Sequence, residues 1–493
     1  MNSELQNFYD NRTMIFVKSL PPDVKPITTK WVYTLKKDGN GNISKYKARL
    51  VARGFTQRKG IDYNLTYSPT LSLDSLKLII ALASKFNWDL MQLDIKAAYL
   101  NAPLDKDIYV NIPPGDKNFG KGYWLLRKAL YGLKQSGRQW HIHFTNFLKN
   151  NGFTQLTSEP CIFVKMEGGR AVCIIGVYVD DLLITGIKYY INKIIKRIKK
   201  NFKVSKCSEA DYILGINIEK ENSSYVISQI QLINDILQKF KVKNIRKSKT
   251  PCSSISNSAK NNEPFDKTTF KSAIGSLIYL ARCTRPDITY AVGKIARNSE
   301  NPTIADWKMV INILKYLNYT KYYKIKYKRQ GEIRAYTDSD FAGDPRDRKS
   351  TSGYIILMDK DPISWQSKKQ TVVATSTAEA EYIATSECTK KVLWFRNILN
   401  ELFNINKPIK IFTDNLASKT SIENGELNNK LKHIEIKFYF NKENIKNNKI
   451  ALEYINTEKM LADQLTKDFN SPKMTKFTDQ IFNKKTFWSE GEC

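Results

Sequence analysis

Two apolar runs that flank a pair of neighbouring acids constrain this chain most, and they lie in residues 171–186. Both runs are rich in β-branched side chains, have the length of strands and enclose Asp180 and Asp181. They predict a buried hairpin with both acids at its tip. Adjacent carboxylates repel each other and are costly to remove from water, so such a tip favours a bound cation. The alternative is a plain surface turn, because Asp-Asp is common in turns.

A third acid upstream favours the metal site over the plain turn. Asp94 ends another apolar run, within residues 90–99. Mg²⁺ prefers oxygen ligands, and three acids that close strands could hold two such ions for phosphoryl or nucleotidyl transfer. Tyr99 follows Asp94 closely enough to line the same pocket, although packing in the core is an alternative for this side chain.

Composition indicates a folded, multidomain chain with a polyanionic partner. The 493 residues suffice for several cores, and 42% hydrophobic with 12% aromatic content argues against disorder. Lys and Arg number 79 against 48 Asp and Glu, a net charge of +31, which favours nucleic acid as the partner. A lysine-rich solvated surface is the alternative. No apolar run reaches the roughly 20 residues of a membrane span, so no membrane partner is expected. Seven scattered cysteines indicate reduced thiols, and three histidines argue against structural zinc.

A basic hairpin is predicted near the start of the chain, after an irregular, proline-containing lead-in over residues 1–27. Two β-rich segments, residues 30–37 and 43–54, flank an Asp/Gly/Asn turn. Lys47 and Arg49 alternate along the second segment, so both could project from one strand face. This ribbon could grip a triphosphate or a template backbone; an edge strand protected by lysines is an equal alternative.

Three motifs in this order resemble reverse transcriptases: Asp94 with Tyr99, Tyr131-Gly-Leu-Lys-Gln135, and Tyr178-Val-Asp-Asp181. The stretches 46–54, 92–101 and 130–135 are similar to those of copia-type long-terminal-repeat retrotransposons, and the resemblance covers nearly the whole chain. It implies an α+β multidomain chain with a right-hand polymerase of fingers, palm and thumb, a connection segment and an α/β ribonuclease H-like domain.

The resemblance also implies roles in the polymerase site. Asp94, Asp180 and Asp181 would bind two Mg²⁺ ions, with Mn²⁺ as a substitute. Tyr99 would exclude a ribose 2′-hydroxyl and so favour deoxynucleotides. Gln135 would contact the incoming nucleotide or the template, with a polar residue on a helix surface as the alternative. Lys47 and Arg49 would bind the triphosphate.

A second set of acids follows from residue 332 onward, where strands, a helix and another strand are expected. Asp338 and Asp414 each end an apolar segment, Glu381 lies early in a helix that begins near Thr375, and Asp463 lies in residues 461–467. Glu381 could merely complement the helix dipole, and Asp414 could merely cap a turn. By resemblance, all four would bind two metal ions in a ribonuclease H fold that hydrolyses the RNA of an RNA–DNA hybrid.

Three neighbours of this second set also enter the prediction. Glu379 competes with Glu381 for the helix position, and the Tyr-Ile-Ala that follows favours Glu381. Asp340 would share a strand face with Asp338 and is a candidate outer-sphere acid. His433 matches a family histidine near the scissile phosphate, or is structural. Where the family often has another histidine this chain has Tyr439, which argues against a His-His metal site.

The predicted organisation begins with a lead-in (residues 1–27), fingers and palm (28–220) and a thumb with a polar linker (221–265). A connection (266–330), a ribonuclease H-like domain (331–470) and a tail (471–493) follow. The expected partners are an RNA template, a DNA primer, an RNA–DNA hybrid, deoxynucleoside triphosphates and other proteins of the element. The expected location is a cytoplasmic virus-like particle, with the nucleus as a second location. Protease, nucleocapsid and integrase motifs are missing, so a fragment, a processed product or a truncated copy is expected. The rival is a silent or domesticated relic that only binds nucleic acid, although none of the seven principal acids is lost.

Overall fold

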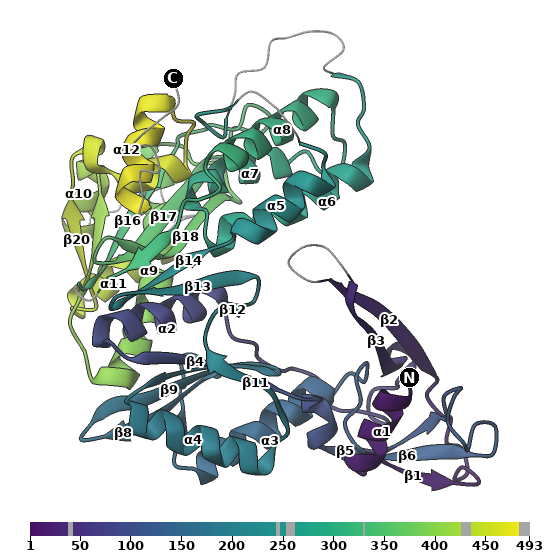
Figure 1. The fold of residues 1–493 in the computed structure, drawn as a ribbon. Helices are drawn as coiled ribbons and strands as arrows, with labels where there is room; N and C mark the ends of the chain where they lie inside the picture. The colour runs from purple at the N-terminus through teal and green to yellow at the C-terminus, as the bar shows by residue number, and fades with distance from the viewer. Residues whose placement is uncertain (38–42, 243–246, 253–261, 329–330, 425–434, 483–493) are drawn as a thin grey trace. The chain divides into compact units, whose positions relative to one another are not determined.

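The computed structural model describes residues 1–37, 43–242, 247–252, 262–328, 331–424 and 435–482 (Figure 1). The chain divides into two compact units: Met1–Leu71 with Met91–Ser208, and Ser72–Leu90 with Glu209–Cys493. In the part of the chain that the structure describes, no helix has the length and apolar character needed to cross a membrane.

The first unit is built on a six-stranded sheet in the order β11-β4-β10-β9-β8-β7. A three-stranded sheet in the order β1-β6-β5 and the two-stranded ribbon β2-β3 complete its strands. Its elements are α1 (Asn2–Asp10), β1 (Met14–Val17), β2 (Thr29–Lys37), β3 (Ile43–Ala52), η1 (Gly54–Thr56), β4 (Asp89–Ile95), η2 (Ala98–Asn101), β5 (Pro103–Asn111), β6 (Tyr123–Lys128), α3 (Ser136–Asn150), β7 (Thr154–Gln155), β8 (Ile162–Glu167), β9 (Arg170–Tyr178), β10 (Asp181–Gly186), α4 (Lys188–Asn201) and β11 (Val204–Glu209).

Helices α3 and α4 cover one face of the six-stranded sheet (Figure 1). In α4, Ile191, Ile194, Ile195 and Ile198 are buried at helical spacing, while the lysines of the same helix face away from the sheet, as its pattern predicts. Each buried isoleucine contributes roughly 1.5–3 kcal/mol relative to an exposed one. This packing holds β9 and β10, and therefore the acids at their tip, in a fixed position.

The second unit contains a four-stranded sheet, β12-β13-β14-β15, and a five-stranded mixed sheet, β18-β17-β16-β19-β20. In the latter, β16 pairs antiparallel with β17 and parallel with β19, and β19 pairs parallel with β20. The unit's elements are α2 (Leu73–Phe86), β12 (Tyr212–Ile213), β13 (Ile216–Glu221), β14 (Ser224–Ser228), α5 (Ile230–Lys239), α6 (Lys267–Cys283), η4 (Pro286–Ile288), α7 (Thr289–Ala296), α8 (Ile304–Tyr319), β15 (Ile325–Tyr327), β16 (Ile333–Ser339), β17 (Thr351–Met358), β18 (Asp361–Lys369), α9 (Thr377–Phe403), β19 (Ile409–Thr413), α10 (Leu416–Asn424), α11 (Glu435–Lys446), β20 (Ile450–Tyr454), η6 (Thr457–Lys459), η7 (Leu461–Leu465) and α12 (Ser471–Ile481).

Several predicted elements are confirmed. The acid-tipped hairpin is β9-β10, and the basic hairpin is β2-β3, whose predicted turn at residues 38–42 lies outside the described residues. The helical spacing of residues 72–87 and their early Ser/Asp cap signal also predict a helix; this helix is α2, with Ser72 accepting a hydrogen bond from the Ser75 backbone N–H as its N-cap.

Other predicted elements differ from the structure. The lead-in is irregular only in part, because α1 and β1 lie within it and α1 buries Leu5 and Phe8. Residues 212–218 resemble the family strand that positions the primer, but they form a tight hairpin, β12-β13, with Leu214 and Gly215 at positive φ of 48° and 69°. Within the predicted thumb, residues 226–242 are expected to form helices, but they comprise the end of β14 and a single helix, α5. The predicted tail begins with a packed helix, α12.

The predicted domain boundaries stay a prediction, and the two compact units divide the chain differently. Residues 72–90, predicted within the fingers and palm, group with the second unit. Part of the predicted linker, at residues 243–246 and 253–261, lies outside the described residues.

Two candidate metal centres

The first set of acids meets where β4 lies between β10 and β11 in the sheet. Asp94 lies near the end of β4, and Asp180 and Asp181 lie at the β9-β10 turn. The Ile95 N–H donates to the Asp180 carbonyl at 2.9 Å, which fixes the turn beside Asp94. All three acids are half-buried. The sheet order thus brings together acids that are 86 residues apart in the sequence.

The turn that carries Asp180 is strained and anchored. Val179 has a φ of +56°, a conformation that β-branched side chains rarely adopt. The Trp140 indole N–H, from α3, donates to the Val179 carbonyl at 2.7 Å. Strained backbone of this kind costs of order 1–3 kcal/mol and persists only where the surrounding structure determines it, as the Trp140 contact does here.

Neighbouring side chains hold the carboxylates of this first centre. The Ser205 hydroxyl, on β11, donates to the Asp94 carboxylate. Gln92 donates to Asp181 Oδ1 at 3.5 Å and accepts from Lys206 Nζ at 3.3 Å. Burial raises the pKa of Asp181, and the carboxylates of Asp180 and Asp94 raise it further. The carboxylates therefore repel one another in this site, and a bound cation would relieve that repulsion.

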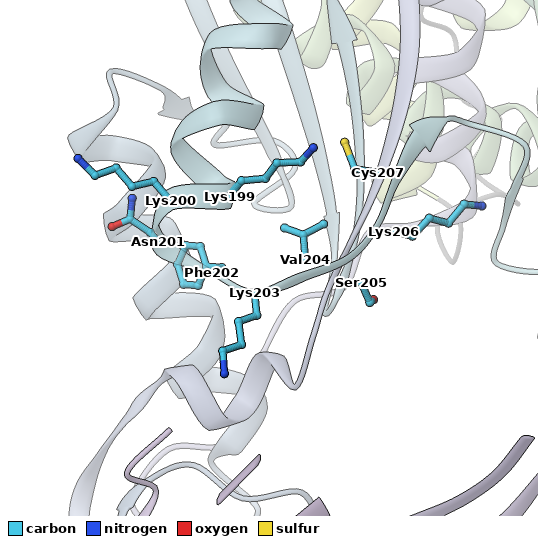
Figure 2. Close-up of a pocket in the computed structure, with 9 residues that line it drawn as sticks. All are labelled: Lys199, Lys200, Asn201, Phe202, Lys203, Val204, Ser205, Lys206 and Cys207. Carbon is cyan, nitrogen blue, oxygen red and sulfur yellow. The ribbon is translucent and has the colours of Figure 1, made fainter. Parts of the chain in front are cut away.

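Figure 2 shows Ser205 and Lys206 among the residues that line a pocket of about 440 Å³ at the end of α4 and the start of β11. Four of its residues are lysines: Lys199, Lys200, Lys203 and Lys206. Sequence reasoning missed Ser205, Gln92 and Lys206. The two-residue spacing between Gln92 and Asp94 was the only signal, since it places both on one face of β4.

Tyr99 and Arg49, two of the predicted nucleotide-binding residues, lie close to Tyr131. The Tyr99 and Tyr131 ring centroids are 4.8 Å apart, and the Arg49 guanidinium carbon lies 5.3 Å from the Tyr131 centroid. Burial, and then the Asp180 charge, raise the pKa of Tyr99, so its ring lies within electrostatic range of the acids. Lys47 shares the Arg49 face of β3 by strand alternation. These residues lie together, and their roles stay predictions.

Gln135 differs from one of its two sequence-based descriptions. Its side chain is fully buried, so it is not a polar residue on a helix surface. Its Oε1 accepts from Gln57 Nε2 at 2.9 Å, and its Nε2 donates to the Asp62 carbonyl at 2.9 Å. In this arrangement the amide ties the 57–62 loop to the start of α3, and contact with a nucleotide stays a prediction that would require these bonds to rearrange.

The second set of acids forms a tighter cluster. Asp338, Asp414 and Asp463 each present a carboxylate oxygen within 4.8 Å of the others, and the described residues contain no other such group of three or more His, Cys, Asp or Glu side chains. Asp338 lies near the end of β16, and Asp414 directly follows β19. Because these strands are parallel neighbours, their carboxyl ends meet at one edge. Asp463 reaches the cluster from η7, and Thr457 donates to Asp414 at 2.8 Å.

Glu381, rather than Glu379, faces this cluster. Its Oε1 accepts from the Ser339 N–H at 3.2 Å. Its Oε2 is buried without a hydrogen-bond partner among the described residues, which suits an oxygen that would coordinate a metal ion. Glu379 instead accepts from the Thr375 N–H and hydroxyl at 2.6 and 2.7 Å, so its carboxylate stabilises the start of α9.

Charge at the second centre is only partly balanced. Burial raises the pKa of Asp338 to about 7, with the Lys467 ammonium opposing the rise and Asp463 and Asp414 adding to it. Burial and then Asp338 hold the pKa of Glu381 well above its usual range. Burial also raises the pKa of Asp463. Four acids with one lysine therefore fit a site for divalent cations.

Lys467 and Thr466 also contact this cluster, and neither was predicted as a site residue. Lys467 Nζ lies 3.1 Å from Asp463 Oδ1 and 3.8 Å from Asp338 Oδ2, and the Thr466 hydroxyl donates to Asp338. The spacing of four residues from Asp463 was a weak signal for the ion pair. Among the other candidates, Asp340 accepts a hydrogen bond from the Thr351 N–H, which ties its carboxylate to β17. His433 lies outside the described residues, and Tyr439 is an exposed residue of α11.

The raised pKa of Asp338 predicts a pH dependence of stability. An unfolded aspartate titrates near 3.9, so between roughly pH 4 and 7 the folded chain keeps a proton that the unfolded chain releases. The free energy of unfolding should therefore fall as pH rises through this window. In chelator-treated buffer, we expect calorimetry to give a melting temperature for this unit several degrees lower at pH 8 than at pH 5, with a smaller drop for Asp338→Asn. Parallel curves for the two proteins would contradict the raised pKa.

The sequence and the fold of this chain are similar to those of known proteins. Residues 11–254 match the family described as reverse transcriptase (RNA-dependent DNA polymerase). A solved structure of the foamy viral protease-reverse transcriptase in complex with double-stranded DNA aligns with 92% of this chain and 69% of its own, with a TM-score of 0.50 and 11% identity. Residues 11–254 therefore belong to the reverse transcriptase family, and the chain has a mixed helix and sheet fold of the polymerase kind.

Curated relatives narrow the family further. The Pol polyprotein of transposon TNT 1-94 from Nicotiana tabacum is 36% identical over 95% of this chain and 36% of its own length. That of transposon RE1 from Arabidopsis thaliana is 33% identical over 98% of this chain and 33% of its own length. The chain is thus a segment of a Pol polyprotein of the copia type, and it spans about a third of the length of these relatives.

Proposed function

We propose that this segment copies RNA into DNA at the first centre and hydrolyses the RNA strand of the resulting hybrid at the second. The observation that carries the proposal is the gathering of distant carboxylates into two separate acidic sites, one in each unit. A lone surface turn would not need the Trp140 anchor at Val179 or the side chains that orient Asp94 and Asp181.

At the first centre, Asp94, Asp180 and Asp181 would hold two Mg²⁺ ions, or Mn²⁺ in their place. Such ions make the primer 3′-hydroxyl a better nucleophile and stabilise the pyrophosphate leaving group. Ser205 would keep the Asp94 carboxylate in place, and Gln92 would orient Asp181. Lys47 and Arg49, on the β3 face that reaches Tyr131, would neutralise the triphosphate.

At the second centre, Asp338, Glu381, Asp414 and Asp463 would hold the metal pair. The metal-bound water would supply the nucleophile that attacks the RNA phosphodiester. Glu381 Oε2 is buried and has no hydrogen-bond partner in the described part of the chain, which supports its role as a ligand. Glu379 is not included, because its carboxylate stabilises the start of α9. The family match ends at residue 254, so the ribonuclease H activity rests on this geometry and on resemblance.

The proposed substrates are an RNA template with a DNA primer, deoxynucleoside triphosphates and the RNA–DNA hybrid. The net charge of +31 supports a nucleic-acid backbone as ligand, and backbone contacts suit recognition of a hybrid by shape. We also propose that other proteins of the element are partners, and that the segment acts in a cytoplasmic virus-like particle or in the nucleus. A relic that only binds nucleic acid is less favoured, because both acidic sites are intact.

The direct test is extension of a DNA primer on an RNA template by the purified chain with Mg²⁺ or Mn²⁺, alongside cleavage of a labelled RNA–DNA hybrid. We expect both reactions, and we expect chelation of the metal to stop both. Tight binding of the hybrid without either reaction would favour the relic instead.

A second prediction concerns sugar selection by Tyr99. Because its ring packs against Tyr131 within range of Asp180, we expect it to block the 2′ position of a bound nucleotide. Tyr99→Ala should lower the preference for deoxynucleotides over ribonucleotides by about tenfold or more, the scale of one lost packing contact. Tyr99→Phe keeps the ring and is the control. Competitive single-nucleotide incorporation measures the preference, and equal preference in wild type and Tyr99→Ala would refute the role.

A further inference from the structure

Lys467 is a cation supplied by the chain itself to the second centre. Its ammonium contacts Asp463 at 3.1 Å and approaches Asp338 to 3.8 Å. A lysine side chain is charged at neutral pH, and this one contacts two of the three acids whose oxygens lie within 4.8 Å of one another.

We propose that the Lys467 ammonium competes with divalent cations for Asp338 and Asp463, so that metal binding at this centre requires the lysine to swing out. The inference rests on the proposed function of the second centre and adds a residue that sets its metal affinity. An ammonium and a divalent ion cannot share the same oxygens closely, because both are positive and each needs direct contact with the carboxylates.

The surroundings of Lys467 allow this exchange. Its side chain is 46% exposed, whereas those of Asp338 and Asp463 are 4% and 8% exposed, so the lysine can reach solvent while the acids cannot. A lysine side chain is flexible and strongly hydrated, which makes the outward position accessible. The Thr466 hydroxyl stays on Asp338 and would keep that carboxylate oriented after the lysine leaves.

Competition makes a quantitative prediction. The apparent affinity for the metal is the intrinsic affinity reduced by the fraction of molecules in which the lysine is outside. Removing the ammonium should therefore tighten metal binding, whereas a lysine that assists metal or substrate binding should have no such effect on the metal alone.

Isothermal titration with Mn²⁺ tests this in the full chain carrying Asp180→Asn and Asp181→Asn, which suppress binding at the first centre. In that background we expect Lys467→Met to lower the Kd about tenfold and Lys467→Arg to stay within about threefold of the parent. An unchanged or higher Kd in Lys467→Met would overturn the competition while leaving the metal centre intact. If the parent gives no binding signal, or if Asp338→Asn leaves that signal unchanged, the second centre does not bind the metal, and this inference fails with the proposed function of that centre.

A measurement on the same parent chain, with Lys467 intact, guards against misfolding of Lys467→Met. Acetylation with an amine-reactive ester, followed by peptide mass spectrometry, should label Lys467 at least about twofold faster when Mn²⁺ is present, because the ammonium is then released from its carboxylates. Lys271 is the matched control: its side chain is 45% exposed and pairs with Glu300 at 2.6 Å, outside the acidic cluster. Its labelling should not change. Labelling of Lys467 that is unchanged or slower with Mn²⁺ would overturn the proposal.

Discussion

Asp180→Asn is expected to abolish DNA synthesis while hybrid cleavage continues at the wild-type rate. Asp180 sits at the tip of β9-β10, where its backbone carbonyl binds the Ile95 N–H and its side chain lies near Asp94 and Asp181. The amide keeps the size of the side chain but removes a negative charge that a metal pair needs. A loss of several kcal/mol of transition-state stabilisation corresponds to about 10³-fold or more in rate.

The control for this variant is Asp107→Asn, in the same unit. Asp107 is 69% exposed and lies 3.9 Å from Arg127 in a surface ion pair, which contributes little. We expect both reactions of this control to match wild type. Primer extension and hybrid cleavage should be measured on the same preparations. Synthesis by Asp180→Asn at the control rate would remove Asp180 from the site, and loss of both reactions would indicate misfolding instead of lost chemistry.

Local sequence patterns sufficed for the acid-tipped hairpin, the basic hairpin and helix α4. The apolar β-branched runs around Asp180 and Asp181 have the length of strands, which favours a pair of strands with the acids at the turn, and this is the pairing observed. Strand alternation likewise placed Lys47 and Arg49 on one face of β3. The helix pattern of α4 was equally direct, because its isoleucines recur at helical spacing.

Long-range packing decided what those patterns could not. The insertion of β4 between β10 and β11 brings Ser205 to Asp94, and nothing near Ser205 in the sequence signals it. Helix α2 was correctly predicted, but its grouping with the second unit depends on residues far along the chain. Lys467 was one basic residue among 79, and its four-residue spacing from Asp463 was only a weak signal, so its contacts were needed to single it out. Helix α1 was missed because it buries only Leu5 and Phe8 and has no side-chain cap.

Asp338→Asn is expected to have the opposite effect to Asp180→Asn. It should lower the rate of hybrid cleavage by about 10³-fold or more while DNA synthesis continues. It should also stabilise the unit at pH 8 without divalent ions, because burial opposes the charge of Asp338 and the amide is neutral. Conversely, Mn²⁺ should raise the melting temperature of wild type more than that of Asp338→Asn, since only the intact centre binds the ion well.

Glu332→Gln, a control at an acid that is 80% exposed and paired with Lys407, should behave as wild type in all three measurements. A structural role alone predicts a less stable Asp338→Asn protein, so a lower melting temperature together with unchanged cleavage would contradict the metal-ligand role of Asp338.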